Sequence, residues 1–207
     1  MIASILPQVD ELNVYLNDYD HVPEALHQPK VNVVLGREAA GDIGDVGKFY
    51  FVSQYKPHDV ALTCDDDLRY PADYADTMRR RIHSYGSVVA AHGDVLEMPI
   101  GTYRTSRRTL SGTGRIDHAC RVHVVGTGTT AFQTYNIAPE LADFPIKNMA
   151  DIWFAKLLQE KQVRATVIPH PRGWLQTLLP SDADTLWSRG ELPETSEVVR
   201  SIDWRLF

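Results

Sequence analysis

The chain has 207 residues, of which 43% are hydrophobic and 23% are charged, and this composition excludes an intrinsically disordered protein. Its net charge of −6 at pH 7 argues against nucleic-acid binding, which requires basic surfaces. No apolar run approaches the ~20 residues that cross a bilayer, and the N-terminal MIASILPQVDEL lacks the basic region of a signal peptide. The two cysteines, Cys64 and Cys120, fall in apolar runs and indicate no disulfide framework. We therefore expect a cytoplasmic protein without a transmembrane segment, and attachment to the inner face of the membrane stays open.

The first part of the chain alternates short apolar runs with polar turns. LNVYL at 12–16 and VNVVL at 31–35 are typical of short strands. The glycine-rich stretch after them contains Asp45, a candidate N-cap for a helix running toward Tyr55. DVALTC at 59–64 is a compact apolar run of strand length, which predicts a third strand.

A helix and a buried strand are predicted next. The segment 71–85 opens with proline, which suits the first turn of a helix, and its apolar residues recur at helical spacing. SVVAA at 87–91 is typical of a buried strand. Alternating strands and helices favour an α/β fold with a mainly parallel sheet. We expect one domain over 1–207, with a core at about 8–175 and a C-terminal tail at 176–207.

The second half of the chain is rich in Gly, Thr, Ser and Arg. Residues 102–115 are basic, which predicts a mobile basic loop, and Asn148 is a candidate cap for the amphipathic helix that follows it. The other elements predicted here are a strand at 120–125, that helix at 148–161, a strand at 164–169 and a short helix near 181–189.

Three aspartates, Asp65, Asp66 and Asp67, follow the predicted strand at 59–64. In parallel sheets, ligands bind beyond the carboxyl ends of the strands. Because successive strand residues point to opposite sides, Asp65 and Asp67 are expected to face one way and Asp66 the other. Two carboxylates on one side suit Mg²⁺ or Mn²⁺, which usually complete their shell with substrate phosphates. A solvated acidic turn that caps the next helix is the alternative, and the residues alone leave both open.

The aspartates also carry a resemblance to a known family. TCDDDLRYPADY resembles the DXD region of family 2 glycosyltransferases with the GT-A fold, particularly the bacterial ones. In the same order, further segments resemble the family's strands, turns and helices from about residue 8 to 175: LNVYLNDYDHVPE, GDIGDVGKF, VVGTGTTAF, NMADIWFA and IPHPRGWL. The resemblance implies a GT-A-like, Rossmann-like α/β fold with a mainly parallel sheet flanked by helices. The family normally begins with one more strand, central in the sheet, which has no counterpart here, so we expect a sheet truncated at the N-terminus.

This resemblance implies a metal-dependent, inverting hexosyltransferase-like enzyme of polysaccharide biosynthesis. A sugar moves from a nucleotide donor, with UDP expected, to a polysaccharide or glycolipid acceptor, and the cofactor is Mn²⁺ or Mg²⁺. Asp67, with Asp65 beside it, is expected to hold the metal, and His170 to complete its shell. A structural or merely exposed histidine is the alternative for His170. Asp151 is expected to act as the general base for the acceptor hydroxyl. It lies in the first turn of the predicted helix, where the dipole favours its charged form, and a mere capping role is the alternative.

Further residues are candidates for binding the nucleotide sugar. Lys48 is expected to contact a phosphate or base edge, Asn17 and Asp18 to hydrogen-bond the uracil or ribose, and Asp66 to reach the ribose. Asp65 is also a candidate for binding the nucleotide sugar. The ordinary alternatives are a solvated helix lysine for Lys48 and an Asx turn for Asn17 and Asp18.

The missing first strand leaves three explanations open. The working protein is longer, donor binding has been lost, or another chain, such as an oligomer partner, covers the exposed sheet edge. The runner-up function is accordingly a catalytically inactive, truncated glycosyltransferase domain that serves as a binding or assembly module. A third class is another Mg²⁺-dependent phosphoryl enzyme, although the absence of a P-loop counts against a nucleotide triphosphatase.

Overall fold

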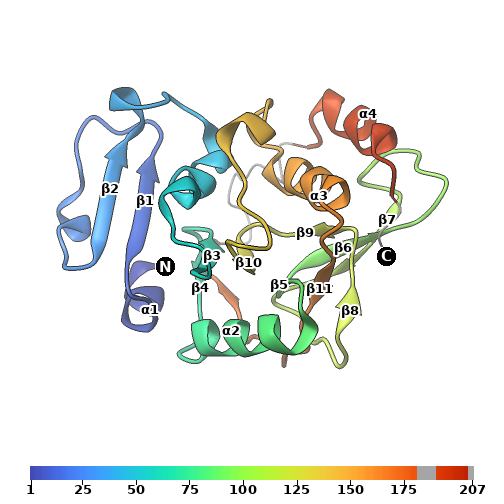
Figure 1. Cartoon of the computed structure of the whole chain (residues 1–207), viewed down its shortest axis with the longest axis horizontal. Coiled ribbons are helices and arrows are strands. Elements are labelled where there is room, and N and C mark those ends of the chain that lie inside the picture. The colour runs from blue at the N-terminus through green and yellow to red at the C-terminus, as the bar shows by residue number, and fades with distance from the viewer. Residues whose placement is uncertain (181–189, 205–207) are drawn as a thin grey trace.

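The computed structural model describes residues 1–180 and 190–204, and in these the chain is a mixed α/β structure whose strands form four small sheets (Figure 1). The short helix predicted near 181–189 lies outside the described residues. Within the described ranges, no helix is both long and apolar enough to cross a membrane.

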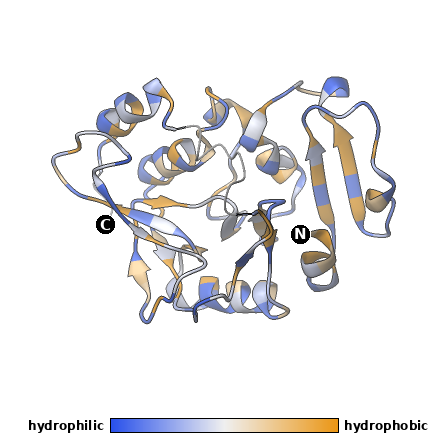
Figure 2. Ribbon diagram, turned by 180° about the vertical axis from the view of Figure 1, so that it is seen from behind, coloured by the Kyte–Doolittle hydropathy of each residue, from blue (hydrophilic) through white to orange (hydrophobic). Residues whose placement is uncertain are grey.

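A two-stranded parallel sheet lies at one side of the molecule (Figure 1). It pairs β1 (Leu12–Leu16) with β2 (Val31–Leu35), as the apolar runs predicted. Both strands are largely hydrophobic with a polar step in the middle (Figure 2). At that step the side-chain Nδ2 of Asn32 donates to Oδ1 of Asn13 at 2.9 Å. This pair fixes the register of the two strands across their exposed faces.

A five-stranded sheet forms the centre of the fold, with the order β3-β10-β5-β11-β8. The strand β10 lies between β3 and β5 and runs antiparallel to both. Only the β5–β11 pair of this sheet is parallel. Its strands are β3 (Val60–Cys64), β5 (Val88–Ala90), β8 (Cys120–Arg121), β10 (Thr129–Gln133) and β11 (Ala165–Val167).

The expectation of one mainly parallel, Rossmann-like sheet is therefore wrong. Most strand pairs in the described residues are antiparallel, and the sheets are small and separate. The physical reason is that residues 91–128, between β5 and β10, contain short strands and no helix, so the long helical crossover that usually joins parallel neighbours is missing. Residues 102–115, expected to be a loop, contain the strand β7, and the strand expected at 120–125 is divided into β8 and β9.

The remaining elements surround these two sheets. The other strands are β4 (Leu68–Arg69) paired with β12 (Gln176–Thr177), and a three-stranded sheet of β6 (Gly93–Leu96), β7 (Arg107–Leu110) and β9 (Val124–Val125). The α-helices are α1 (Ile2–Ile5), α2 (Tyr74–Tyr85), α3 (Ala150–Glu160) and α4 (Pro193–Ser201). The 3₁₀ helices are η1 (Leu6–Gln8), η2 (Glu24–Leu26), η3 (Gly36–Glu38), η4 (Gly44–Phe49), η5 (Val52–Gln54) and η6 (Leu141–Asp143).

The helices α2 and α3 pack on opposite faces of the five-stranded sheet. Met78 and Ile82 of α2 lie in one buried cluster with Val89 of β5. Phe154 of α3 lies in another cluster with Ala90, the next residue of that strand. This alternation follows from strand geometry, in which neighbouring side chains point to opposite faces. Both faces of the sheet are thus covered, and the sites open to ligands lie at its ends and free edge.

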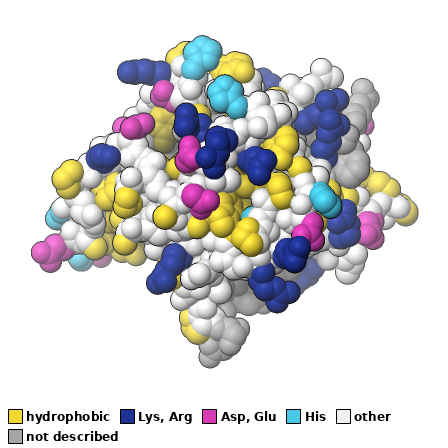
Figure 3. Space-filling view, turned by 90° about the horizontal axis from the view of Figure 1, so that it is seen from below, with side chains coloured by type: hydrophobic (Ala, Val, Ile, Leu, Met, Phe, Trp, Pro, Cys, Tyr) yellow, Lys and Arg dark blue, Asp and Glu magenta, His cyan; other side chains and the backbone are white. Residues whose placement is uncertain are grey.

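The outer surface of α2 carries charges of both signs. Asp76 makes ion pairs with Arg79 and Arg80 at 3.0 and 2.6 Å. Seen from this side, basic side chains are interspersed with acidic and hydrophobic ones (Figure 3). This face therefore lacks the continuous basic patch that attracts nucleic acid.

Candidate functional site

A large open pocket of about 2810 Å³ contains most of the residues singled out in the sequence. Every residue of β1 and of β3 lines it, together with the loops that follow both strands. Its volume exceeds the ~300–1,000 Å³ of an ordinary small-molecule site, so there is room for more than one ligand. The predicted site residues that line the pocket are Asn17, Lys48, Asp65, Asp66, Asp67 and Asp151.

The segment that carries Lys48 is fixed by Asp45. The carboxylate of Asp45 accepts backbone N–H groups from Asn148 at 2.7 Å and from Ala150 at 2.9 Å. Asp45 therefore caps the start of α3 across the fold, and not a helix of its own, because the segment after it forms the 3₁₀ helices η4 and η5. Asn148, expected as the cap, has a φ of 62° and serves as a left-handed connection into α3.

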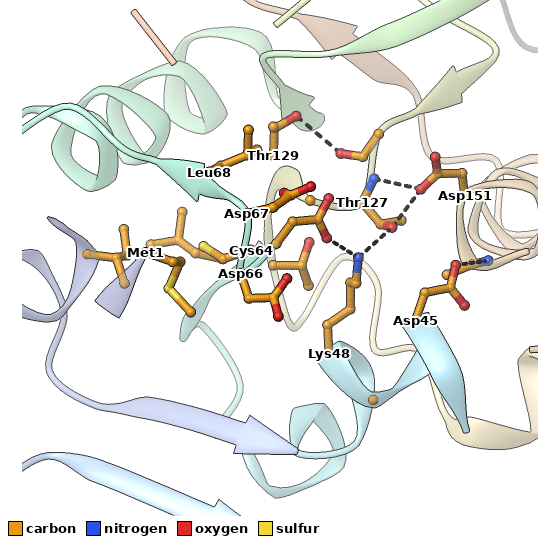
Figure 4. A pocket seen from close by; sticks show the side chains of 18 of the residues that line it. Met1, Asp45, Lys48, Cys64, Asp66, Asp67, Leu68, Thr127, Thr129 and Asp151 are labelled. Atoms are coloured by element: carbon orange, nitrogen blue, oxygen red, sulfur yellow. Dashed lines mark hydrogen bonds and ion pairs between the residues drawn. The ribbon is translucent and has the colours of Figure 1, made fainter. Parts of the chain in front are cut away.

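Lys48 forms an ion pair with the first of the three aspartates (Figure 4). Its Nζ lies 2.5 Å from Oδ1 of Asp65, and it also donates to Oγ1 of Thr127 at 3.4 Å. The Lys48 side chain is only 15% exposed, whereas that of Asp65 is 42% exposed. Burial alone lowers the pKa of Lys48, but the carboxylates of Asp65, Asp151 and Asp45 outweigh it and raise this pKa. Lys48 is therefore a fixed positive charge at neutral pH.

Thr127 connects this pair to Asp151 (Figure 4). Its backbone N–H and its hydroxyl both donate to Oδ1 of Asp151, at 2.8 and 2.6 Å. The second oxygen, Oδ2, has no hydrogen-bond partner in the described part of the chain. Asp151 lies in the first turn of α3, where the helix dipole favours its charged form. One oxygen is thus held in place while the other is left to accept a proton.

The position of Asp65 depends on its close neighbours. Its backbone N–H donates to the hydroxyl of Tyr70 at 2.8 Å, and that hydroxyl donates to the carbonyl of Gly128 at 2.6 Å. Gly128 lies so close that a Cβ added there would be 1.8 Å from Oδ2 of Asp65. The loop after β3 and the turn before β10 therefore fit together around this carboxylate.

The other two aspartates differ in exposure. Asp66 is exposed, whereas Asp67 is half-buried. Burial raises the pKa of Asp67, and the negative charges of Asp65 and Asp66 raise it further. Its charged form is thus disfavoured by its surroundings, and a cation bound beside it would remove that cost.

The aspartates after β3 supply some of the ligands that a divalent cation needs. Asp67 and Asp65 supply carboxylate oxygens, the donors that Mg²⁺ and Mn²⁺ prefer. No group of three or more His, Cys, Asp or Glu side chains converges to hold a metal anywhere in residues 1–180 and 190–204. A cation here would take its remaining ligands from water and substrate phosphates, as Mg²⁺ usually does.

The remaining predicted residues are placed less favourably. Asn17 lines the pocket, but its amide is engaged, since Nδ2 donates to the carbonyl of Gly44 and Oδ1 accepts from Ile43 N–H. Asp18 is exposed outside the pocket lining. His170 is buried, with Nε2 lying 3.0 Å from the carbonyl of Ala91 and the ring stacked on Trp174. The structure therefore does not bring His170 together with Asp65 and Asp67.

The sequence did not indicate several residues that position the charged side chains of the site. Thr127, Gly128, Tyr70 and Asp45 all position the charged residues, and His92 lines the same pocket with its Nδ1 accepting the N–H of Gly112 at 3.2 Å. The run GTGT at 126–129 could have pointed to Thr127 and Gly128, because glycines are typical of tight turns, but nothing in it indicates a contact with an aspartate. Tyr70 also contacts Gly128, and Asp45 contacts Asn148 and Ala150. These partners lie far away in the chain, and no local pattern reveals them.

Comparison with known proteins adds no relative. No protein-family model matches the chain, and no curated protein matches it with significant similarity.

Proposed function

We propose that the chain is a metal-dependent inverting glycosyltransferase that moves a sugar from a nucleotide diphosphate donor, expected to be UDP-linked, to a glycan or glycolipid acceptor. The observation that supports this best is the connected line Asp65–Lys48–Thr127–Asp151 on the wall of one large pocket. It combines a fixed cation, neighbouring carboxylates and a separate oriented carboxylate. The resemblance of TCDDDLRYPADY and the segments around it to family 2 glycosyltransferases supports the same reaction.

The proposed chemistry divides among these residues. Lys48 neutralises charge on the diphosphate as it leaves, because it stays protonated at neutral pH. The bond between the anomeric carbon and the diphosphate oxygen breaks, through a transition state with oxocarbenium character. The acceptor oxygen bonds to that carbon on the opposite face, and its proton passes to Oδ2 of Asp151. One carboxylate is enough for this direct, inverting transfer.

The cofactor in this proposal is Mn²⁺ or Mg²⁺ held by Asp67 with Asp65. When bound, it stabilises negative charge on the leaving diphosphate. Asp67 is suited to this place because its own charge is disfavoured without a neighbouring cation. Asp66 is exposed and lines the pocket, and in this proposal it hydrogen-bonds the ribose.

Calorimetric titration of UDP into the purified chain, with and without Mn²⁺, tests the proposal. We expect binding that requires Mn²⁺ and that Asp67→Asn weakens at least tenfold. Asp117→Asn is the matched control, because Asp117 is exposed, pairs with Arg115 and does not line the pocket. A folded chain that binds no UDP with Mn²⁺ present would refute the proposal.

The second candidate is the binding or assembly module. It is favoured by one observation, the opening between β1 and β3, since no strand of the described residues lies between these two. Measurement of donor hydrolysis separates the two candidates. A transferase releases UDP from a UDP-sugar with water as the acceptor, whereas a binding module releases none.

A further inference from the structure

We infer that His92 donates a hydrogen bond from its ring Nε2–H to a hydroxyl oxygen of an uncharged acceptor sugar, and so positions that sugar beside Asp151. The inference deepens the proposed function and rests on it for the transfer step. His92 comes shortly after β5, is half-buried and lines the pocket. None of the steps assigned to Lys48 and the aspartates involves it.

The His92 side chain fits closely against two glycines. A Cβ added at Gly126 would lie 2.7 Å from Cδ2 of His92, and one added at Gly112 would lie 3.3 Å from its Cβ. The backbone of His92 is held as well. Its N–H donates to Oγ1 of Thr129 at 3.1 Å, and its carbonyl accepts from the N–H of Gly126 at 2.9 Å. The fold therefore fixes where the ring lies.

The contacts of the ring decide which nitrogen carries the proton. Gly112 N–H donates to Nδ1 at 3.2 Å, so Nδ1 is an acceptor and the proton of the neutral ring is on Nε2. Nε2 has no hydrogen-bond partner within residues 1–180 and 190–204. Cδ2, the ring atom bonded to Nε2, lies against Gly126, and both glycines line the pocket. Nε2–H is therefore a donor at the pocket wall that a ligand oxygen can use.

The turn that packs against His92 also holds Asp151. Thr127, the residue after Gly126, donates from its backbone N–H and its hydroxyl to Oδ1 of Asp151. The next residue of the turn packs against Asp65. His92 thus lies at the end of this turn away from Asp65, with Asp151 bound between them. A sugar whose hydroxyl reaches Oδ2 of Asp151 is accordingly a neighbour of His92.

The strand β7 gives this part of the pocket a polar floor. Arg107 and Thr109 of β7 line the pocket, whereas Arg108 and Leu110 do not. Because side chains alternate along a strand, one face of β7 is turned toward the pocket. Two more hydroxyl residues that line the pocket follow the strand, and the four together are here called the β7 floor: Arg107, Thr109, Ser111 and Thr113. Hydroxyl groups both donate and accept hydrogen bonds, so this floor suits a sugar better than an alkyl chain.

The charges at the β7 floor cancel. Asp94 of β6 is 2% exposed, and its Oδ2 accepts from Arg107 Nη1 and from the hydroxyl of Tyr103, both at 2.6 Å. Its Oδ1 accepts from the hydroxyl of Thr109 at 2.5 Å. Burial raises the pKa of Tyr103, and the charges of Asp94 and Asp151 raise it further, so Asp151 lies near this floor. With Arg107 matched by Asp94, an uncharged sugar fits here better than a carboxylated or phosphorylated one.

The part that His92 plays is positioning. Its Nε2–H holds a hydroxyl of the acceptor sugar, so that the attacking hydroxyl of the same sugar points at Oδ2 of Asp151. His92 gives up no proton in this role, and Asp151 remains the base. Loss of one such hydrogen bond should weaken acceptor binding about fivefold.

NMR of the full chain with ¹⁵N-labelled histidine rings tests the contact directly. The probes are the methyl glycosides of glucose, galactose, mannose and N-acetylglucosamine, at high millimolar concentration with UDP and diamagnetic Mg²⁺ present. Without a probe, the proton of the His92 ring should be on Nε2. At least one glycoside should then shift the Nε2–H signal, and the exposed His118, which does not line the pocket, is the internal control. A proton on Nδ1, or no shift with any of the glycosides, would overturn the inference.

Two substitutions separate the donor from the shape of the ring. His92→Gln keeps an N–H donor near the place of Nε2, whereas His92→Phe keeps a ring and loses the donor. With the glycoside that shifts Nε2–H as acceptor, we expect His92→Phe to raise the KM for that glycoside about fivefold, and His92→Gln to raise it less. The loss should appear in the KM for the glycoside more than in the KM for the donor. His118→Phe is the control variant. A KM for the glycoside that is higher in His92→Gln than in His92→Phe would assign the ring to packing and overturn the inference.

Failure of the proposed function gives a different result. A chain that neither binds UDP nor transfers sugar refutes glycosyl transfer, whereas a glycoside-dependent shift at Nε2–H still supports a saccharide contact at His92. Transfer by His92→Phe with the wild-type KM for the glycoside refutes the role of His92 and leaves the transferase proposal intact.

Discussion

A Cβ atom at Gly128 would lie 1.8 Å from Oδ2 of Asp65, so the turn before β10 leaves just enough room for the carboxylate after β3. Even alanine is excluded unless the Asp65 side chain turns away. Because Asp65 also holds Lys48, such a movement disturbs the whole charged line of the site.

Gly128→Ala should therefore destabilise the chain by about 1–3 kcal/mol and weaken ligand binding at the site. Thermal unfolding and UDP titration measure the two effects. Gly101→Ala is the control, because a Cβ there meets only Ser106 Oγ, at 3.6 Å. Equal melting temperatures for Gly128→Ala and Gly101→Ala would contradict this account.

Lys48→Met should lower the free energy of unfolding by about 1–2 kcal/mol, since it leaves the half-buried Asp65 without its cation. The folded pKa of Lys48 lies above its ordinary 10.5, so its stabilising effect is complete below pH 10.5 and declines only as pH rises through the folded pKa. The difference between wild type and variant should therefore stay constant from pH 7 to pH 10 in urea unfolding. A difference that shrinks steadily over that range would be inconsistent with a raised pKa.

Asp67→Asn should raise the melting temperature at pH 7 by roughly 1–2 °C when no divalent cation is present. The pKa of Asp67 is raised above the unfolded value of 3.8, so its charge destabilises the fold above the folded pKa. As pH falls, both states become protonated, and the gain should vanish below pH 3.8. Scanning calorimetry at pH 7 and pH 3.5 checks this, with Asp117→Asn as the exposed control. A variant that is less stable at pH 7 would refute it.

Asp45→Ala should cost about 1–2 kcal/mol, because it removes the acceptor for two N–H groups at the start of α3. Asn148→Gly should be neutral or slightly stabilising, since a φ of 62° suits glycine. Urea unfolding of the two variants distinguishes the cap seen in the structure from the one expected in the sequence. If Asn148→Gly lowered the free energy of unfolding more than Asp45→Ala does, Asn148 would be the cap.

Local pattern was a good guide to individual elements of this chain. Apolar runs of five residues gave β1 and β2 at their observed bounds, and helical periodicity located α2 and α3. Strand direction was missed because periodicity carries no information about it. No helix between β5 and β10 carries the chain back to the start of the sheet, and β10 runs antiparallel to both β3 and β5.

For the candidate site, the sequence indicated the charged residues but not the contacts that orient them. The carboxylates of Asp65, Asp67 and Asp151 were identifiable because each follows or begins a predicted element. The contacts that orient them join residues far apart, such as Asp45 with Ala150 and Lys48 with Thr127. These depend on how the sheets pack, which a single sequence does not encode in any local pattern.

The partial burial of Cys64 at the wall of the pocket has a consequence for handling the protein. Burial raises the pKa of its thiol to about 12, so at neutral pH almost none of it is the thiolate that reacts with oxidants and alkylating agents. Air and iodoacetamide should therefore react only slowly with this sulfur while the protein stays folded. Rapid alkylation at Cys64 would accordingly signal that the strand carrying it has come away from its neighbours.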